Sequence, residues 1–189
     1  MNNYSLSELI KSDLYRYCGK FDLKSFCSTY FKNPAFRFTV WLRICYIIRK
    51  NRFRKLLLLP FTRIFYNHYK YKYGYDIPYS ISIGPGLLIF HFGGIVFNPS
   101  SCGKNMTLSH CTTVGMTIIN GEKYFPVIKD NVYLAPGSKV IGNLTIESNC
   151  AIGTNAVVTK STNENDVLVG IPAKVISSKG ASAYINNPV

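Results

Sequence analysis

The second half of the chain has an apolar residue at every sixth position, as in the stretch IKDNVYLAPGSKVIGNLTIESNCAIGTNAVV at residues 128–158. The apolar members of this stretch are Ile128, Leu134, Val140, Ile146, Ile152 and Val158. An α-helix repeats every 3.6 residues and a flat strand every two, so neither explains a period of six. This period is typical of a parallel β-helix, in which three hexads close one triangular coil.

The same period runs upstream, where isoleucine stands at positions 77, 83, 89 and 95. After one inserted residue, Cys102, Leu108 and Val114 continue the series, and residues 116–125 interrupt it as a loop. Small residues follow many series members, among them Gly84, Gly103, Ala135 and Gly153. We therefore predict that residues 75–178 form a mainly β coil domain with aliphatic side chains stacked inside.

Residues 1–74 show a helical pattern instead. Apolar residues recur there at steps of three and four, as in Phe36, Val40, Trp41, Ile44, Ile47 and Ile48. The pattern continues past a break that we expect near Pro60. The sequence thus predicts an N-terminal α-helical region at residues 1–74, the coil domain at 75–178, and a C-terminal tail at 179–189.

Charge is unevenly distributed along the chain. The formal net charge is +13, and residues 23–75 contain twelve Lys and Arg but no Asp or Glu. A basic segment of this kind favours an anionic partner. Three interpretations remain open: the segment packs on its own oligomer, lies on the cytoplasmic face of the inner membrane, or binds nucleic acid. The chain has no nucleic-acid-binding motif, so we expect no nucleic-acid partner.

Cysteine usage and hydropathy predict a cytoplasmic protein. The six cysteines form no CxxC pair and no metal-ligand spacing with histidine, so we expect free thiols and no metal. Glu8, Lys11 and Asp13 interrupt any signal peptide. The longest apolar run, residues 56–59, is far shorter than the roughly 20 residues that a bilayer crossing needs.

Several motifs resemble one family. They include Tyr-Asp-Ile-Pro at residues 75–78, His-Phe-Gly-Gly-Ile-Val at 91–96 and Gly-Ile-Pro-Ala-Lys-Val-Ile at 170–176. With the hexads, they make residues 30–178 resemble the hexapeptide-repeat acetyltransferases, in particular the serine acetyltransferase-like branch associated with bacterial polysaccharide O-acetylation. The resemblance implies left-handed coils, a homotrimer, and acetyl-CoA bound between neighbouring subunits.

Transfer of an acetyl group to an alcohol needs a base that removes the hydroxyl proton, and histidine suits this task near neutral pH. The resemblance implies that His91 is the general base and that Asp76 orients it. His110 follows His91 by nineteen residues, one coil plus the inserted residue, so we expect the two rings side by side. Four roles of His110 stay open: binding the acceptor, assisting the base, contacting the thioester, or a purely structural role.

The resemblance also implies positions for acetyl-CoA. Backbone and small residues at Gly115, Ala135 and Gly153 would contact it, and Lys160 or Lys174 would meet its 3′-phosphate. We expect no metal cofactor. His91 and His110 do not supply the three-histidine set of a carbonic anhydrase-like metalloprotein.

The acceptor site departs from the serine enzymes at two points. Phe90 replaces the acidic residue before the base, and the loop reads Lys123, Tyr124, Phe125 where those enzymes have a histidine. We expect these residues, with Phe92, to bind a carbohydrate acceptor. The sequence-based prediction is therefore direct acetyl transfer to a sugar hydroxyl of a bacterial surface polysaccharide or its precursor. The alternatives are a serine O-acetyltransferase and a non-catalytic β-helix scaffold.

Overall fold

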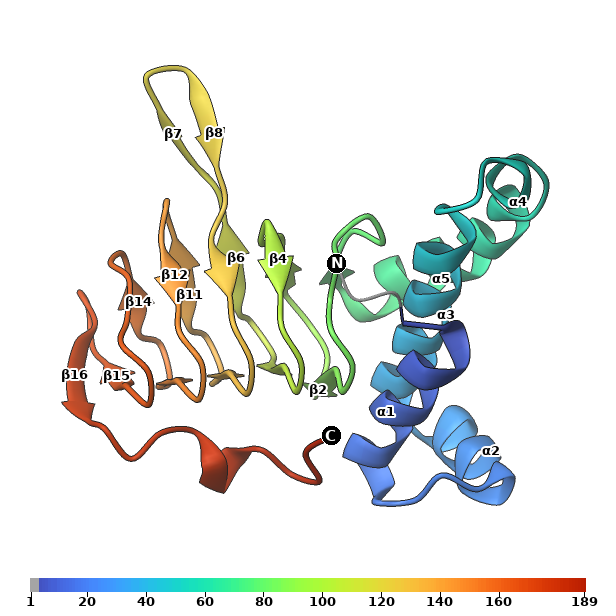
Figure 1. Cartoon of the computed structure of the whole chain (residues 1–189), viewed down its shortest axis with the longest axis horizontal. Coiled ribbons are helices and arrows are strands. Elements are labelled where there is room, and N and C mark those ends of the chain that lie inside the picture. Colours follow the sequence, from blue (N-terminus) through green and yellow to red (C-terminus); the bar gives the residue numbers. More distant parts are fainter. Residues whose placement is uncertain (1–3) are drawn as a thin grey trace.

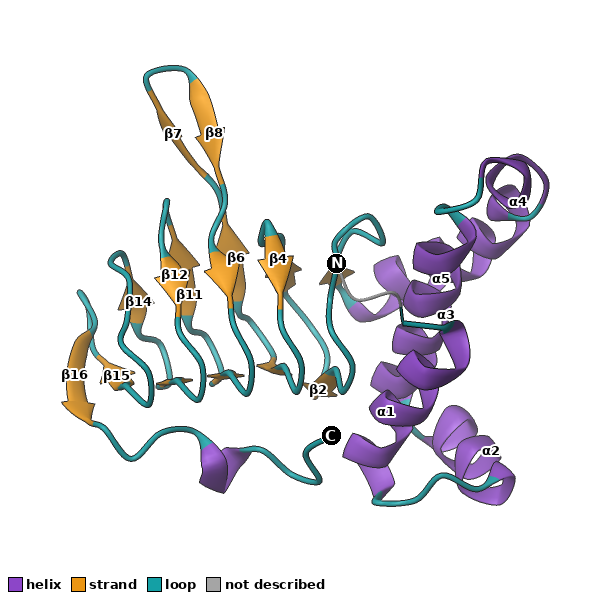
Figure 2. Ribbon diagram, in the orientation of Figure 1, coloured by secondary structure: helices purple, strands orange, loops and turns teal. Residues whose placement is uncertain are grey.

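The computed structural model describes residues 4–189 and consists of a helical arm joined to a stack of coils (Figures 1 and 2). Residues 1–3 of the predicted helical region lie outside the described residues. The arm contains α1 (Leu6–Cys18), α2 (Leu23–Lys32), α3 (Pro34–Ile48), α4 (Arg52–Leu57) and α5 (Leu59–Tyr73). None of the described helices is both long and apolar enough to cross a membrane.

Local sequence signals explain where these helices begin and end. Ser5 and Glu8 form a capping box at the start of α1, and Gly19 ends this helix with a left-handed φ of 67°. The break predicted near Pro60 lies earlier, at Leu58 between α4 and α5. Pro60 instead stands in the first turn of α5, where its missing N–H costs no hydrogen bond.

The coil stack, residues 75–177, is built from short strands that are each two to four residues long. These are β1 (Tyr75–Asp76), β2 (Leu88–Phe90), β3 (Ile95–Phe97), β4 (Ser101–Cys102), β5 (Thr107–Ser109), β6 (Thr113–Gly115), β9 (Val127–Ile128), β10 (Tyr133–Leu134), β11 (Lys139–Ile141), β12 (Thr145–Ile146), β13 (Ala151–Ile152), β14 (Val157–Val158), β15 (Val167–Val169) and β16 (Lys174–Ser177).

The strands assemble into three sheets that form the sides of the stack. Sheet A has the order β1-β3-β6-β11-β14, sheet B the order β12-β9-β4, and sheet C the order β16-β15-β13-β10-β5-β2. Apart from the antiparallel β15–β16 pair, the strand pairs within these sheets are parallel. The chain visits sheets C, A and B in turn, so each coil has three sides, as the hexads predict. The left-handed sense of the coils stays a prediction.

The core of the stack contains the hexad series. All its predicted members are buried, with exposed fractions from 0% to 7%. The series slips at one place, because the strand register pairs Val114 with Phe97 and not with Ile95. Ile95 is also buried but lies opposite Tyr75. Gly93 and Gly94, with φ of 111° and 65°, take up the extra residues in the preceding turn.

Asparagines line the corner where the chain passes from sheet B to sheet C. Asn105, Asn131, Asn149 and Asn165 all have positive φ, which asparagine tolerates better than most residues. The side-chain amide of Asn105 donates to Asn131 at 2.8 Å, and that of Asn131 donates to Asn149 at 2.9 Å. This ladder links successive coils at the turn.

A buried charge network joins the arm to the first coil. Arg43 of α3 pairs with Asp13 of α1 at 2.8 Å, and both side chains are at most 2% exposed. Asp13 also accepts hydrogen bonds from the backbone N–H groups of Gly86 and Leu87, while Arg43 donates to the carbonyl of Gly84. The two charges are thus neutralised by each other and hydrogen-bonded to the coil backbone, as buried ions require.

Residues 178–189 form a strap that runs back along the stack from β16 to α1 (Figure 1). The strap contains a 3₁₀ turn, η1 (Ser182–Tyr184), and the Tyr184 ring stacks on Tyr133 at 4.7 Å between centroids. Its last residues reach the arm, where Arg16 donates from Nε to the Asn186 carbonyl at 2.6 Å. The division of the chain into three domains stays a prediction, although the strap is packed along its length.

Candidate active site

Two histidines stand together at the corner where the chain passes from sheet C to sheet A. His91 follows β2 and His110 follows β5, and these strands pair in register. The ring centroids are 5.5 Å apart and the ring planes are nearly perpendicular, at 83°. The neighbouring position that the nineteen-residue spacing predicts is therefore confirmed. We call this edge of the stack the histidine corner.

The backbone at His91 is held in an unusual conformation. His91 has a φ of 62°, which is uncommon for a residue with a β-carbon, and its side chain is exposed. The Tyr75 hydroxyl donates to the His91 carbonyl at 3.0 Å. Burial raises the pKa of Tyr75, so this hydroxyl stays protonated and keeps its donor role. This bond holds the backbone from which the exposed imidazole projects at the edge of the stack.

His110 is more enclosed than His91. Its ring is partly buried, and the Nδ1 atom is buried without a hydrogen-bond partner among the described residues. Of the two ring nitrogens, Nε2 is therefore the one left to meet a bound molecule.

A cavity of about 350 Å³ adjoins His91. The arm contributes Arg16, Tyr17 and Asn33, the coil contributes Phe90 and Phe92, and the strap contributes Asn186 to its lining. Arg16 is the one lining residue with a formal charge. Burial lowers its pKa to about 10, although Asp13 opposes this shift, so the guanidinium remains charged at neutral pH. Each of its three nitrogens donates to the protein itself, to the Asn186 and Gly86 carbonyls and to the Thr107 hydroxyl, and the residue is 1% exposed. Arg16 therefore joins the arm, the coil and the strap at the wall of the cavity.

The predicted contact between Asp76 and His91 is absent from the described residues. Asp76 instead pairs with Lys70 at 2.7 Å, on the face where β1 lies beside β3. The Asp76 side chain is 57% exposed, so it has room to change partner. The geometry of one chain alone does not orient the His91 ring with a carboxylate.

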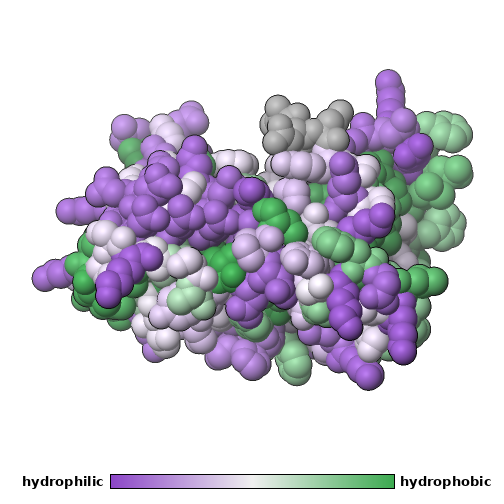
Figure 3. All heavy atoms as spheres, turned by 60° about the horizontal axis from the view of Figure 1, so that its bottom comes forward, coloured by the Kyte–Doolittle hydropathy of each residue, from purple (hydrophilic) through white to green (hydrophobic). Residues whose placement is uncertain are grey.

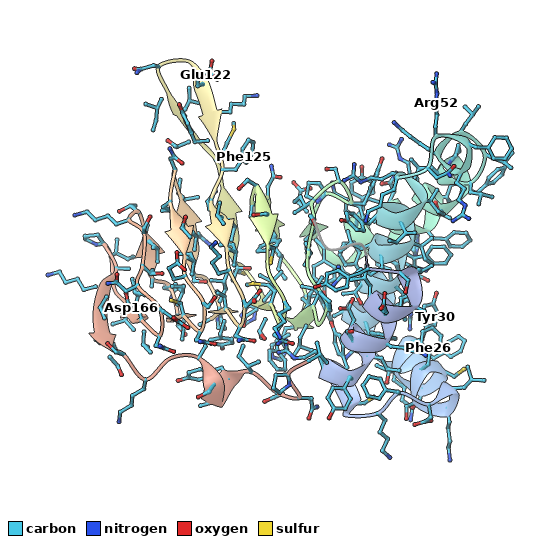
Figure 4. The ribbon with its side chains drawn as sticks, viewed as in Figure 1. Phe26, Tyr30, Arg52, Glu122, Phe125 and Asp166 are labelled. Carbon is cyan, nitrogen blue, oxygen red and sulfur yellow. The ribbon has the colours of Figure 1, made fainter. Side chains whose placement is uncertain are left out.

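The loop predicted at residues 116–125 is a β-hairpin, made of β7 (Thr117–Ile119) and β8 (Glu122–Tyr124). Asn120 and Gly121 form its turn with positive φ, a sequence signal for hairpins that our prediction of a loop missed. The hairpin projects away from the stack, with Glu122 near its tip and Phe125 at its base (Figure 4).

The hairpin leaves the stack between sheets A and B, a different corner from that of the histidines. We call this edge the hairpin corner. Lys123, Tyr124 and Phe125 do not line the cavity beside His91, whereas Phe90 and Phe92 do. The predicted acceptor residues are therefore divided between two corners of one chain.

The predicted acetyl-CoA residues are divided in the same way. Ala135 and Gly153 follow β10 and β13, and so continue the row of Phe90 at the histidine corner. Gly115 ends β6 and Lys160 follows β14, which places both at the hairpin corner. Lys174 lies on β16 and is exposed. One chain does not bring the five together.

Sequence reasoning missed the contribution of the arm and the strap to this cavity. Tyr17 accepts a hydrogen bond from the Ile89 backbone at 3.0 Å, and Asn186 approaches from the far end of the chain. Asp13 and Arg16, spaced by three residues on α1, are both buried, but the sequence alone does not distinguish them from charges on an exposed helix face. The strap has no periodicity that predicts its path.

Within residues 4–189, no three His, Cys, Asp or Glu side chains gather into a metal-binding group.

Comparison with known proteins identifies the fold of the chain. The family model described as bacterial transferase hexapeptide, six repeats, matches residues 125–160. The structure of serine acetyltransferase from Neisseria gonorrhoeae superposes with a TM-score of 0.76 at 23% identity, covering 95% of this chain and 69% of that one. A Brucella abortus serine acetyltransferase in complex with coenzyme A gives 0.76 at 22% identity, covering 92% and 68%. The chain thus has the hexapeptide-repeat transferase fold with N-terminal helices.

Sequence comparison adds particular relatives. Serine acetyltransferase from Staphylococcus epidermidis is 39% identical over 108 residues, which are 57% of this chain and 51% of that protein. Serine acetyltransferase from Staphylococcus aureus is 38% identical over 108 residues, with the same coverage. The chain therefore spans about half the length of the curated relatives that it matches.

These relatives correct the prediction of the acceptor. A sugar hydroxyl of a surface polysaccharide is the wrong acceptor, because the similar proteins and structures are named serine acetyltransferases. The prediction gave too much weight to Phe90 and to the missing loop histidine.

Proposed function

We propose that the chain is an acetyl-CoA-dependent O-acetyltransferase with serine as its acceptor. The observation that carries the proposal is the exposed His91, which lies beside His110 and adjoins a cavity of about 350 Å³. The names of the relatives support the same reaction. The cavity beside His91 is lined in part by polar residues, among them Asn33 and Asn186, which suits a small polar acceptor.

In the proposed reaction, His91 accepts the proton of the serine hydroxyl while the oxygen attacks the thioester carbonyl. The tetrahedral intermediate collapses, the bond to sulfur breaks, and the CoA thiolate leaves. The imidazolium of His91 then returns the proton to sulfur. The products are O-acetylserine and CoA, so the transfer is direct and needs no acyl-enzyme.

His110 has a supporting role in the proposal. With Nδ1 buried and unpaired, the ring presents its Nε2–H as the available donor. Such a donor can stabilise the oxygen that becomes negative in the intermediate. His110→Gln, which keeps a donor, should retain more activity than His110→Leu. Equal activity of the two variants would leave His110 a structural role only.

Asp76 is proposed as a positioning residue for His91. It must leave Lys70 to reach the ring, because the present ion pair joins the two at 2.7 Å. Asp76→Asn should lower kcat and shift the pH profile of turnover, since an aspartate stabilises the imidazolium. Lys70→Met is the matched variant, and it should leave this profile in place. An unchanged profile in Asp76→Asn would remove Asp76 from the mechanism.

The proposal includes a homotrimer of left-handed coils with acetyl-CoA between subunits. The split of the predicted residues supports it, because a neighbouring copy can bring its hairpin corner to the histidine corner of this chain. The small residues Ala135 and Gly153 leave room there for an extended thioester arm. Exposed apolar residues at these edges, among them Met116, Ile118 and Ile171, also suit a protein interface. Light scattering that showed an active monomer would contradict this arrangement.

The test of the function is release of free CoA, measured by thiol titration with serine as acceptor. His91→Ala should lower turnover about 10²–10⁴-fold, as expected for loss of a general base. His68→Ala is the control, because His68 lies exposed on α5 and contacts Tyr69. Absence of CoA release in the wild type would favour the non-catalytic scaffold instead.

A further inference from the structure

The helical arm exposes an unusual number of large apolar side chains on α4 and α5. Their exposed fractions are high: 74% for Phe53, 81% for Leu56, 67% for Phe61, 65% for Ile64 and 49% for Phe65. Hydrophobic side chains lie beside hydrophilic ones on the surface of this end of the molecule (Figure 3). Contiguous exposed apolar surface of this kind marks a contact site.

The exposed residues form one face of α5. This helix packs on α3 with a buried stripe that includes Leu59, Tyr66 and Tyr73. Phe61, Ile64 and Phe65 recur at steps of three and one, so they share the opposite face. Phe65 is fixed there by stacking on Trp41 at 4.4 Å. The outward face of α5 is therefore apolar where a helix on a solvated surface is usually polar.

Cationic residues border the same face. Arg52, Arg54, Lys55 and Arg63 are all exposed, and neither of the two ion pairs in the described part of the chain involves them. Arg52 projects outward from the end of the arm (Figure 4). Because residues 23–75 contain no Asp or Glu, no acid on α4 or α5 neutralises this charge. We call these residues, together with the exposed apolar ones, the basic apolar face.

A groove between α4 and α5 combines the two properties. Its lining includes Arg52, Lys55 and Arg63 around Leu56 and Pro60. A second hollow shares Lys55 and Arg63 and adds Arg49, whose Nε is buried without a hydrogen-bond partner among the described residues. The cationic groups thus converge where apolar side chains are exposed.

We propose that the basic apolar face docks the protein on an anionic phospholipid bilayer. Short amphipathic segments bind membranes by inserting apolar side chains at the headgroup boundary, while Lys and Arg attract the lipid phosphates. The geometry meets both needs. Charge complementarity favours lipid over a second copy of this face, because two such faces would repel each other. The inference does not depend on the proposed acetyl transfer.

The test is co-sedimentation with vesicles of phosphatidylcholine alone or mixed with phosphatidylserine. The wild type should bind the mixed vesicles, and added salt should weaken this binding. A triple variant that removes three charges should weaken partitioning about 100-fold; it carries Arg52→Gln, Lys55→Gln and Arg63→Gln. The matched control removes three exposed charges elsewhere and should bind like the wild type; it carries Lys104→Gln, Lys129→Gln and Lys179→Gln.

The apolar contribution is tested separately. Phe61→Ser with Ile64→Ser should weaken partitioning at least about tenfold, whereas Leu23→Ser with Phe31→Ser, at exposed positions on α2, should not. Circular dichroism checks that each variant folds; the charge-removal variant keeps the apolar face, so it tests the proposal independently. Absence of wild-type binding to the mixed vesicles would overturn the proposal. So would a drop in assembly mass, measured by light scattering, in Phe61→Ser with Ile64→Ser.

Discussion

In the coil stack, the apolar members of the hexad series are at most 7% exposed, whereas α4 and α5 expose Leu56 and Phe61 by more than two thirds. Both regions are rich in apolar residues, but only the stack encloses them. Each coil covers the next, so a period of six suffices to specify the interior. A single layer of helices buries one side of each helix and leaves the opposite side uncovered. Apolar content therefore predicts burial only where the architecture provides a second covering layer.

The junction between the two regions should show the largest effect on stability. Arg43→Met leaves the buried carboxylate of Asp13 without its cation, and this should cost about 3–5 kcal/mol of unfolding free energy. Denaturant unfolding at fixed protein concentration measures the loss. The control is Arg49→Met. Arg49 lies six residues after Arg43, at the end of α3, where it is partly exposed and belongs to neither ion pair of the described residues. A loss below about 1 kcal/mol would show that the network does not hold the arm on the stack.

The contrast between enclosed and exposed apolar residues can be tested directly. Leu134→Ala, inside the stack, should cost about 2–5 kcal/mol because it removes a side chain that neighbours cannot replace. Ile64→Ala, on the outward face of α5, should change stability by less than about 0.5 kcal/mol. The same denaturant series measures both. Equal losses would mean that Ile64 is covered in solution by a folded partner.

The strap should contribute less to the free energy of unfolding than the buried residues of the stack do. Tyr184→Ala removes a ring that stacks on Tyr133 with an interplanar angle of 9°, and we expect a loss of about 1 kcal/mol. Tyr71→Ala, which is 75% exposed on α5, provides the matched truncation of an exposed tyrosine. If the two variants melt at the same temperature, the stacked ring adds nothing to stability.

The smallest expected effect on stability is the pH-dependent contribution of Glu8. The hydrogen bond that the Glu8 carboxylate accepts from the Ser5 backbone N–H lowers the pKa of Glu8. Because this pKa is lower in the folded state, the stabilisation is present at neutral pH and is lost as the pH falls below about 4. Glu8→Gln should therefore melt slightly below the wild type at pH 7, and the difference should shrink in acid. A difference that grows in acid would contradict this sign.

The stack was predictable because its geometry repeats. Every member of the hexad series is inside, and the single error, Ile95 in place of Phe97, occurs where Gly93 and Gly94 lengthen a turn. The helices were predictable as a region, but the position of the break was not. Pro60 can end a helix or start one, and the choice depended on Leu58 and the packing that follows.

The site was predictable only in part. The spacing of His91 and His110 placed the two rings together, because one coil has a fixed length. The cavity beside them is different, since it combines Tyr17 of α1 with Asn186 of the strap. Contacts between segments so distant in sequence leave no periodic signal. The acceptor was wrongly predicted because it was judged from single positions, Phe90 and the loop residues, which carry no repeating signal.

The strap also affects how the molecule can come apart. If each coil contacted only the coils next to it, unfolding would begin at the last coil of the stack. Here the strap bonds to Asn165 and Asn149 in the last coils and, through Asn186, to Arg16 in the arm. Opening at the distal end therefore has to release contacts at the proximal end as well. The strap makes both ends of the stack part of one cooperative unit, and no coil is a free terminus.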